Sequence, residues 1–485
     1  MRNTVRNSAI AAAVVAGIGL GGGASTAEAA NWILLQGTEP FGKAHTLQMW
    51  GFMQPTYRYI QNKDIKGTPL DGKRPVFNTV SPDRSSNQSF SVFRARIGAR
   101  GVMHPVNDKI NYFFLATFDQ DGLTRLSEPG NGTQHAQLSD ASVTFRQLAG
   151  GTTRDPWNPG VSLRFGQFKV PTADEGSRGI MSFDYINFSE VTRQEVLERY
   201  VKSDGTASKP HYTFTGLDGF RTQGIQLFDE IKFSHNWEGT WAVSLGNGNG
   251  INRNDNDSNL DLYLRAQVSY VFGGVKRGGP RRQDLKLFAW SQTGKRRYDS
   301  DGNGVYSGKE RHYDRDRYGV GFHFYKQPYR LSGEYIWGKG MVFTGVKPPV
   351  SDPKGVGPNP TNNIGDLNPQ YAPKGGNEFN GYYLEGAYFL IPNKFALQAR
   401  YDVLNRLTKT PSSNNPDGER KFETITLGLQ YWNHPVKGQW MLNYRIRNLS
   451  APNMPSGSVP NKVGDAMGNE IGIQYFLLFK NVALR

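Results

Sequence analysis

The sequence alternates between apolar and polar residues over stretches that are unusually long. From Leu260 to Phe272 every second residue is apolar, and the positions between include Asp261, Arg265 and Gln267. Successive side chains of a strand point to opposite faces, so a period of two indicates strands with one apolar face. The stretches run for about 10–15 residues, whereas strands of soluble proteins average about 5–6 residues. Their length suits a strand that crosses a bilayer at a tilt, which needs about 9–11 residues.

The connections between these stretches alternate in length. Links such as 234–235 and 392–393 are short, whereas 170–218 and 343–378 are long. Short turns on one rim and long loops on the other are typical of outer-membrane barrels, and closure pairs every strand edge within the lipid. Two β-sandwich domains would also explain the alternation, but they would not explain the loop rhythm. Sixteen strands are predicted, at roughly 44–59, 90–103, 109–119, 138–148, 160–169, 219–233, 236–247, 259–272, 284–297, 315–326, 328–342, 379–391, 394–406, 421–433, 437–449 and 468–479.

Residues 1–29 are predicted to be a secretory signal peptide. Arg2 and Arg6 precede a short apolar stretch at 8–20, and Ala27-Glu28-Ala29 supplies a small-x-small cleavage pattern. The apolar stretch is too short to span a bilayer. We therefore expect export through the inner membrane and a single all-β domain over residues 30–485, a transmembrane antiparallel β-barrel in the outer membrane.

Composition excludes several classes of protein. The 485 residues include no cysteine, which rules out disulfides and Cys-ligated zinc. The eight histidines are scattered, and the chain has no His-Glu-x-x-His, Gly-x-Ser-x-Gly or Walker motif, so we expect no enzyme and no required cofactor. The net charge of +15 could suit nucleic acid, but the interior of a charged barrel explains it better, and we expect no nucleic-acid partner.

An arginine row marks the second predicted strand. If Phe93, Ala95, Ile97 and Ala99 face lipid, then Arg94, Arg96 and Arg100 line the lumen. Alternate residues lie about 6.6 Å apart, so an anion would meet successive guanidinium groups. The other predicted lumenal cations are Arg164, Lys169, Arg178, Arg445 and Arg447. In the alternative interpretation, lumenal acids neutralise these cations, and the candidates are Asp119, Asp261, Glu334, Glu385 and Asp402.

A second motif lies in the connection at 298–314. Residues 299–310 match the twelve-residue calcium loop, with acids or an amide at positions 1, 3 and 5, Gly304 at position 6 and a glutamate at position 12. The predicted calcium ligands are Asp299, Asp301, Asn303, Val305 (through its carbonyl), Ser307 and Glu310. An ordinary turn rich in Asp, Asn and Gly remains the alternative. The strand count assigns the loop to the extracellular rim.

Four stretches, at 93–101, 111–114, 138–143 and 163–171, together resemble the phosphate-selective porin O and P family. They supply, in order, an arginine-rich strand, an aromatic strand, an Asp-Ala pair and the sequence Gly-Gln-Phe-Lys-Val-Pro. The resemblance implies a sixteen-stranded, usually trimeric channel that conducts anions. It also implies that the connection 170–218 folds into the lumen as a constriction loop, where 189–200 is expected to form a short helix with Ser189 as its N-cap.

The function predicted from the sequence is therefore a porin, a passive, water-filled diffusion channel that favours phosphate or similar small anions. The expected partners are outer-membrane lipid and lipopolysaccharide, small anions and two further copies in a homotrimer. In the alternative, the barrel is a sleeve, an anchor or an adhesin for a partner protein, with little conductance of its own.

Overall fold

The computed structural model shows how these segments assemble. It describes residues 45–61, 63–72, 74–75, 88–118, 137–149, 160–179, 183–198, 219–252, 254–255, 258–275, 282–298, 311–347, 350–351, 368–411, 418–435 and 437–482. The predicted signal peptide and the predicted calcium loop lie outside these residues.

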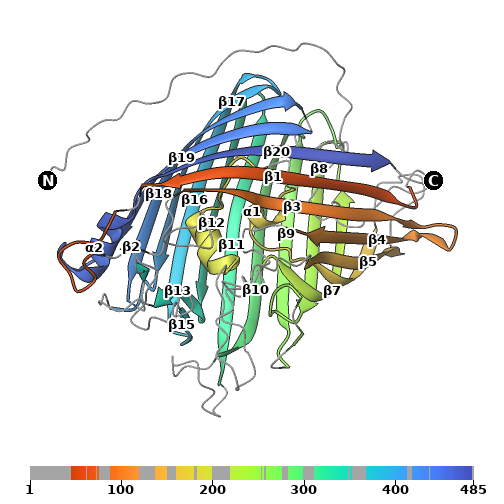
Figure 1. Ribbon diagram of the computed structural model, residues 1–485. Coiled ribbons are helices and arrows are strands. Elements are labelled where there is room, and N and C mark those ends of the chain that lie inside the picture. The colour runs from red at the N-terminus through yellow and green to blue at the C-terminus, as the bar shows by residue number, and fades with distance from the viewer. Residues whose placement is uncertain are drawn as a thin grey trace.

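Sixteen antiparallel strands close into one barrel within the described residues, which confirms the predicted fold class (Figure 1). The strands are 9 to 16 residues long, as the alternation predicts. They are β1 (Gln48–Ile60), β3 (Gln88–Met103), β4 (Asn107–Thr117), β5 (Gln137–Ala149), β6 (Val161–Lys169), β7 (Arg221–Lys232), β8 (Trp237–Gly246), β9 (Asp261–Val271), β10 (Asp284–Tyr298), β11 (Arg311–Lys326), β12 (Tyr329–Lys339), β16 (Glu378–Ile391), β17 (Phe395–Arg406), β18 (Arg420–His434), β19 (Gly438–Ser450) and β20 (Glu470–Val482).

The first strand closes the barrel by pairing with the last one. β1 runs antiparallel to β20 from Gln48↔Val482 to Ile60↔Glu470, and its other edge pairs with β3. Every other barrel strand pairs with its neighbours in chain order, and β12 pairs directly with β16. Among the described strands of the barrel no edge is left open, which is the condition for a sheet to stand in lipid.

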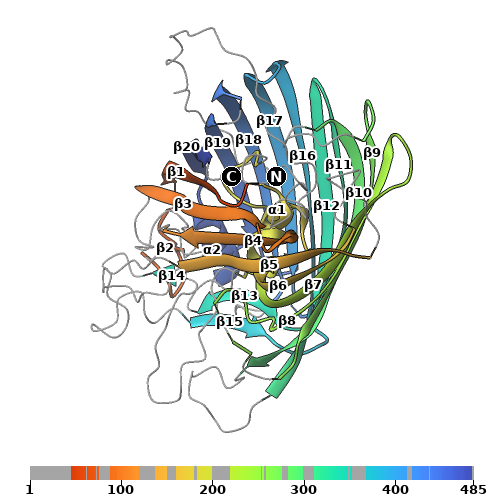
Figure 2. The same ribbon diagram turned by 90° about the vertical axis from the view of Figure 1, so that its right-hand side faces the viewer.

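Smaller elements occupy the long connections. α1 (Asp174–Ser177) and the π-helix η3 (Thr192–Val196) follow β6, and α2 (Val459–Ala466) precedes β20. β13 (Val342–Lys347) pairs with β15 (Asn368–Ala372), and β2 (Arg74–Pro75) pairs with β14 (Val350–Ser351). Figure 2 shows α1 within the ring of barrel strands. None of the helices in the described part combines the length and the apolar character needed to cross a membrane.

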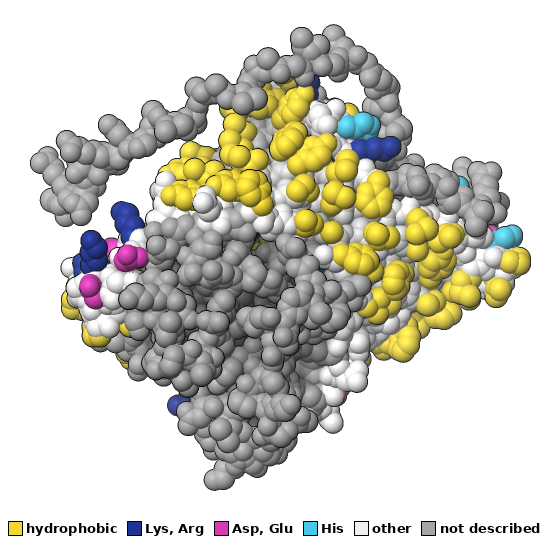
Figure 3. All heavy atoms as spheres, in the orientation of Figure 1, with side chains coloured by type: hydrophobic (Ala, Val, Ile, Leu, Met, Phe, Trp, Pro, Cys, Tyr) yellow, Lys and Arg dark blue, Asp and Glu magenta, His cyan; other side chains and the backbone are white. Residues whose placement is uncertain are grey.

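The outer face of the barrel is apolar. Alternate residues such as Leu264, Leu427 and Ile473 are exposed on it, and apolar side chains cover much of the barrel wall in Figure 3. Tyr335 stacks on Trp337, with ring centroids 5.5 Å apart, on the same outer face. A band of this kind suits contact with lipid tails, and tyrosine and tryptophan suit the two interfaces.

One predicted orientation is wrong. Phe93 was expected to face lipid, but it is buried inside the barrel against Ile186 and Met441. A β-bulge causes the difference, because the pairing of β1 with β3 shifts between Gln54 and Pro55 and leaves Phe93 as the extra residue. Beyond the bulge the predicted parity holds, since Ile97 is exposed and Arg96 is buried.

Candidate functional site

The barrel interior is dense in charge. Sixteen arginines and thirteen carboxylates of the described residues are buried, and no described lysine is among the buried residues. Removing a charge from water costs several kcal/mol unless it is paired or hydrogen-bonded. The partners of these groups therefore decide what the interior can do.

The predicted arginine row faces this interior and lies against aromatic rings. The Arg94 guanidinium carbon lies 4.3 Å from the centre of the Phe93 ring, and Arg94 Nη1 donates to Gln54 Oε1 at 3.0 Å. Arg96 lies 6.0 Å from the Phe52 ring, and Arg100 lies 5.9 Å from the Phe113 ring. Guanidinium groups retain their charge while they stack on aromatic faces.

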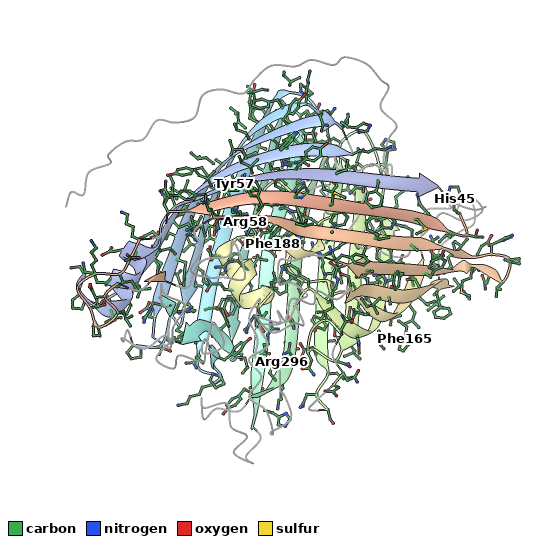
Figure 4. The ribbon with its side chains drawn as sticks, in the orientation of Figure 1. His45, Tyr57, Arg58, Phe165, Phe188 and Arg296 are labelled. Carbon is green, nitrogen blue, oxygen red and sulfur yellow. The ribbon has the colours of Figure 1, made fainter. Side chains whose placement is uncertain are left out.

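Arg58 joins this row and was not predicted. It is 1% exposed, and its guanidinium carbon lies 4.2 Å from the centre of the Phe93 ring. Figure 4 shows Arg58 and Phe188 in the same region of the interior, whereas Phe165 lies on the outer wall. The parity of β1 could have revealed Arg58, because Gln54, Thr56 and Arg58 share the polar face.

Arg164 also faces inward, from β6. Its Nη1 donates to Gln226 Oε1 at 2.6 Å, and its guanidinium carbon lies 4.7 Å from the Phe228 ring. Lys169, at the end of β6, donates to the backbone carbonyl of Arg178 at 3.2 Å. Arg164 is therefore buried inside the barrel, whereas Lys169 is half-buried and binds the chain that follows β6.

That chain lies against inward-facing side chains of the strands. We call the described residues 170–179 and 183–198 the inward segment. Arg178 on this segment donates to Asp174 at 2.7 Å, to Glu385 of β16 at 2.5 Å and to Ser332 of β12 at 3.0 Å. Arg178, which was predicted to line the anion path, is thus bound to carboxylates and holds the segment to two strands.

The second half of the inward segment is attached to the last strands of the barrel. Arg445 donates to Glu190 at 2.8 Å and to Glu470 at 2.8 Å. Arg447 lies 3.8 Å from Glu470 and donates to the Gly468 carbonyl. The predicted pair Arg445 and Arg447 therefore faces the interior, as expected, and is bound to carboxylates and a carbonyl.

Two further arginines that the sequence analysis missed hold the end of the segment. Arg315 donates to Glu198 at 2.5 Å, and Arg317 donates to the backbone carbonyl of Glu195 at 2.8 Å. Both arginines lie on the polar parity of β11, which was the available signal. The predicted short helix is present, since helical residues 190–191 continue into the π-helix η3. Ser189 directly precedes it, and its carbonyl accepts from the Arg193 N–H at 2.9 Å, whereas its hydroxyl donates to Glu175 at 2.5 Å.

Burial and arginine contacts shift the pKa values of the segment's carboxyl groups in opposite directions. Burial opposes ionisation of Asp174, but Arg178 and Arg265 outweigh it and hold the Asp174 pKa at about 2. Burial raises the pKa of Asp184 to about 6 despite its contact with Arg330. Burial likewise raises the pKa of Glu195 to about 7, which Arg317 and Arg406 only partly offset. Asp184 and Glu195 therefore change charge near neutral pH.

The alternative interpretation also has support, because several of the acids it named bind interior cations. Asp261 pairs with Arg296 at 3.0 Å, and Asp402 pairs with Arg400 at 3.2 Å. Glu334 instead accepts hydrogen bonds from Trp290 and Tyr383. Asp119 lies outside the described residues. The interior thus contains both arginines that are paired with carboxylates and arginines that lie against aromatic rings.

The described residues contain no group of three or more His, Cys, Asp or Glu side chains that could hold a metal ion. The predicted calcium ligands at 299–310 are outside that part of the chain and stay a prediction.

Solved structures of outer-membrane proteins resemble this chain at low sequence identity. The barrel superposes on OmpF of Salmonella typhi in its complex with daunomycin, with 13% identity over 90% of this chain and 98% of that one and a TM-score of 0.49. It also superposes on an anion-selective porin from Comamonas acidovorans, with 14% identity over 89% and 99% of the two chains and a TM-score of 0.47.

No curated protein sequence matches the chain. The sequence model of the phosphate-selective porin O and P family, however, matches residues 75–475, which is most of the barrel. The chain belongs to the phosphate-selective porin O and P family.

Proposed function

We propose that this protein is a passive, water-filled diffusion channel that favours phosphate or similar small anions. The family and the closed barrel support a porin in the outer membrane, and they indicate a channel rather than an enzyme. The observation that supports the anion preference is the set of inward-facing arginines on three strands of one part of the barrel, Arg58 of β1, Arg94, Arg96 and Arg100 of β3, and Arg164 of β6.

The proposed role of the inward segment is to narrow the channel. Its contacts with β12, β16 and β19 support this role, because chain bound to inward-facing side chains takes up part of the barrel's cross-section. A narrower passage brings a permeating anion closer to fixed charges, and Coulomb energies grow as the distance falls.

The proposed assembly is a homotrimer, as the family resemblance implies, in contact with outer-membrane lipid and lipopolysaccharide. The mass of the detergent-solubilised protein, measured by light scattering, tests this assembly. A single copy in the micelle would contradict it.

Reversal potentials in planar bilayers test the channel and its selectivity together. The purified barrel should give discrete conductance steps. In a potassium chloride gradient, the sign of its reversal potential should show that chloride is more permeant than potassium. Conductance steps with a cation-selective reversal potential would contradict the anion preference but not the channel. An absence of steps would favour the sleeve, anchor or adhesin.

A further inference from the structure

The outer face of the barrel carries pairs of opposite charge at the strand ends that lead into the long connections. Lys295 of β10 lies 4.0 Å from Asp314 of β11, and Lys339 of β12 lies 3.7 Å from Asp316 of β11. Asp314 and Asp316 share the parity of Val320, which is exposed on the outer wall. The strand register places each lysine directly opposite its aspartate, so all four side chains are on the outer face.

Two further pairs continue this row around the barrel. Lys409, just after β17, lies 2.7 Å from Glu378 of β16, and Lys421 lies 2.9 Å from Glu423 within β18. Glu378 is also the register partner of Lys339, so the row is continuous from β12 to β16. We call these four lysines and four carboxylates the charged belt.

Aromatic rings border the charged belt on the side of the apolar wall. Along β11, Tyr318 follows Asp316 at the next outward position, and along β12, Trp337 and Tyr335 follow Lys339. Tyr318 stacks on Trp337, with ring centroids 5.6 Å apart. Aromatic girdles of outer-membrane barrels lie where the apolar band meets the lipid headgroups. The charged belt therefore lies at the height of the headgroups, on the rim of the long loops.

Other strands are apolar on the outside at the corresponding ends. Phe90 of β3 is 83% exposed, and Leu245 of β8 and Leu260 beside β9 are exposed as well. In the proposed homotrimer an apolar side suits contact with the neighbouring copies, because interfaces between identical subunits are more apolar than other protein surface. The charged belt is thus on a side that remains for lipid.

From this arrangement we infer that the charged belt binds the phosphorylated headgroup of lipid A, the glycolipid part of lipopolysaccharide, together with the divalent cations that bridge its phosphates. An ion pair between exposed side chains contributes little to stability, so either member exchanges its partner at small cost. Each lysine then binds a phosphate. Each carboxylate binds a divalent cation, which prefers carboxylate and phosphate oxygens as ligands. The inference rests on the lipopolysaccharide contact of the proposed function and adds its site.

Binding of lipid A to the delipidated barrel in detergent and millimolar magnesium tests the lysines, with native mass spectrometry as the measurement. The variant K295M/K339M/K409M/K421M should bind lipid A that carries both phosphates about tenfold more weakly than the parent. The matched control removes four exposed lysines from the rim of the short turns, K109M/K232M/K394M/K437M, and should bind as the parent does.

Two further comparisons test the phosphates and the divalent cations. Lipid A without its phosphates should bind the parent weakly, a comparison that needs no variant. Chelation of magnesium should weaken binding of phosphorylated lipid A to the parent. The variant D314N/D316N/E378Q/E423Q should respond less to chelation, because it lacks the carboxylates that hold the cations.

Equal affinities of the parent for the two forms of lipid A, or equal affinities of the parent and the lysine variant for the phosphorylated form, would overturn the inference. A lysine variant that binds lipid A normally but no longer forms trimers would assign the charged belt to the contact between subunits instead. Conductance separates these failures from failure of the channel. The charged belt lies outside the lumen, so the lysine variant should keep the parent's conductance steps and reversal potential. A parent without steps would contradict the channel, while its affinity for lipid A would still decide the role of the belt.

Discussion

Arg445 of β19 donates through Nη2 to Glu190 of the inward segment at 2.8 Å, although the two residues are 255 positions apart in the chain. The same guanidinium binds Glu470 of β20 through Nη1 at 2.8 Å. One arginine therefore joins the inward segment to the strand that closes the barrel, and its loss leaves two buried carboxylates without this partner.

Replacing Arg445 by methionine should destabilise the barrel. Breaking a buried ion pair from one side costs about 3–5 kcal/mol, because the remaining charge stays buried. Urea unfolding of the reconstituted barrel measures the loss. Lys462→Met is the control, because Lys462 forms an exposed pair with Asp465 and should change stability by no more than about 0.5 kcal/mol. A loss under about 1 kcal/mol in R445M would show that the pair does not hold the segment.

Replacing Arg94, Arg96 and Arg100 together by alanine should lower the anion-to-cation permeability ratio. Two unit charges 4 Å apart interact by about 4 kcal/mol at an effective dielectric constant near 20, and a tenth of that changes the ratio about twofold. Reversal potential in a salt gradient is the measurement. The triple lysine variant keeps the charge and should keep the ratio. An alanine variant with the parent's ratio would remove this row from the anion path.

Acidification from pH 8 to pH 5 should increase the anion preference. Burial raises the pKa of Asp184 to about 6 and that of Glu195 to about 7, so both carboxyls take up protons in this range. Arg330, Arg178 and Glu385 face Asp184, whereas Arg317, Arg406 and Glu198 face Glu195. Protonation of these two carboxyls adds about two positive charges to the interior as the pH falls.

The same pKa shifts make attachment of the inward segment to the strands depend on pH. A carboxyl whose pKa is raised in the attached segment stabilises that attachment at low pH, and this stabilisation is lost as the pH rises through the raised pKa. The double variant D184N/E195Q should flatten the pH dependence of the reversal potential. Asp174→Asn should leave the slope unchanged, because the Asp174 pKa of about 2 keeps that group ionised throughout. An unchanged slope in D184N/E195Q would assign the titration to other groups.

Glycine at position 381 allows the inward segment to approach β16. A Cβ added there would lie 2.5 Å from the Val403 carbonyl oxygen and 2.7 Å from Val191 Cβ. Gly381→Ala should therefore cost about 1–3 kcal/mol, as overpacking does. Gly386→Ala on the same strand would meet only a Leu331 methyl group at 3.1 Å and the Arg330 carbonyl oxygen at 3.8 Å, so it is the matched control. Equal urea midpoints for both variants would contradict the close approach.

The loop 299–310 should bind calcium weakly, with a dissociation constant of about 10⁻⁴–10⁻³ M, as in extracellular modules. Glu310→Gln should weaken binding most, because position 12 supplies two oxygens. Isothermal titration of the solubilised barrel measures this. Equal heats for the parent and E310Q, or no heat at millimolar calcium, would leave an ordinary polar turn.

The barrel could be predicted from the order of the residues alone. Each barrel strand has one face in lipid, so each must alternate between apolar and polar residues, and this alternation can be recognised from neighbouring residues. The positions of all sixteen strands could therefore be predicted, as could the inward orientation of Arg96, Arg164 and Arg445. The same reasoning failed at Phe93, because a bulge inserts one residue and reverses the parity on one side of it.

The pairing of the buried charges, in contrast, could not be predicted without the fold. Nothing local links Glu190 to Arg445 or Glu198 to Arg315, since closure of the barrel brings these residues together. The shifted pKa values of Asp184 and Glu195 have the same origin, because burial depends on how residues distant in sequence surround a group. The sequence could therefore predict an arginine-rich interior, whereas the partner of each arginine depended on the fold.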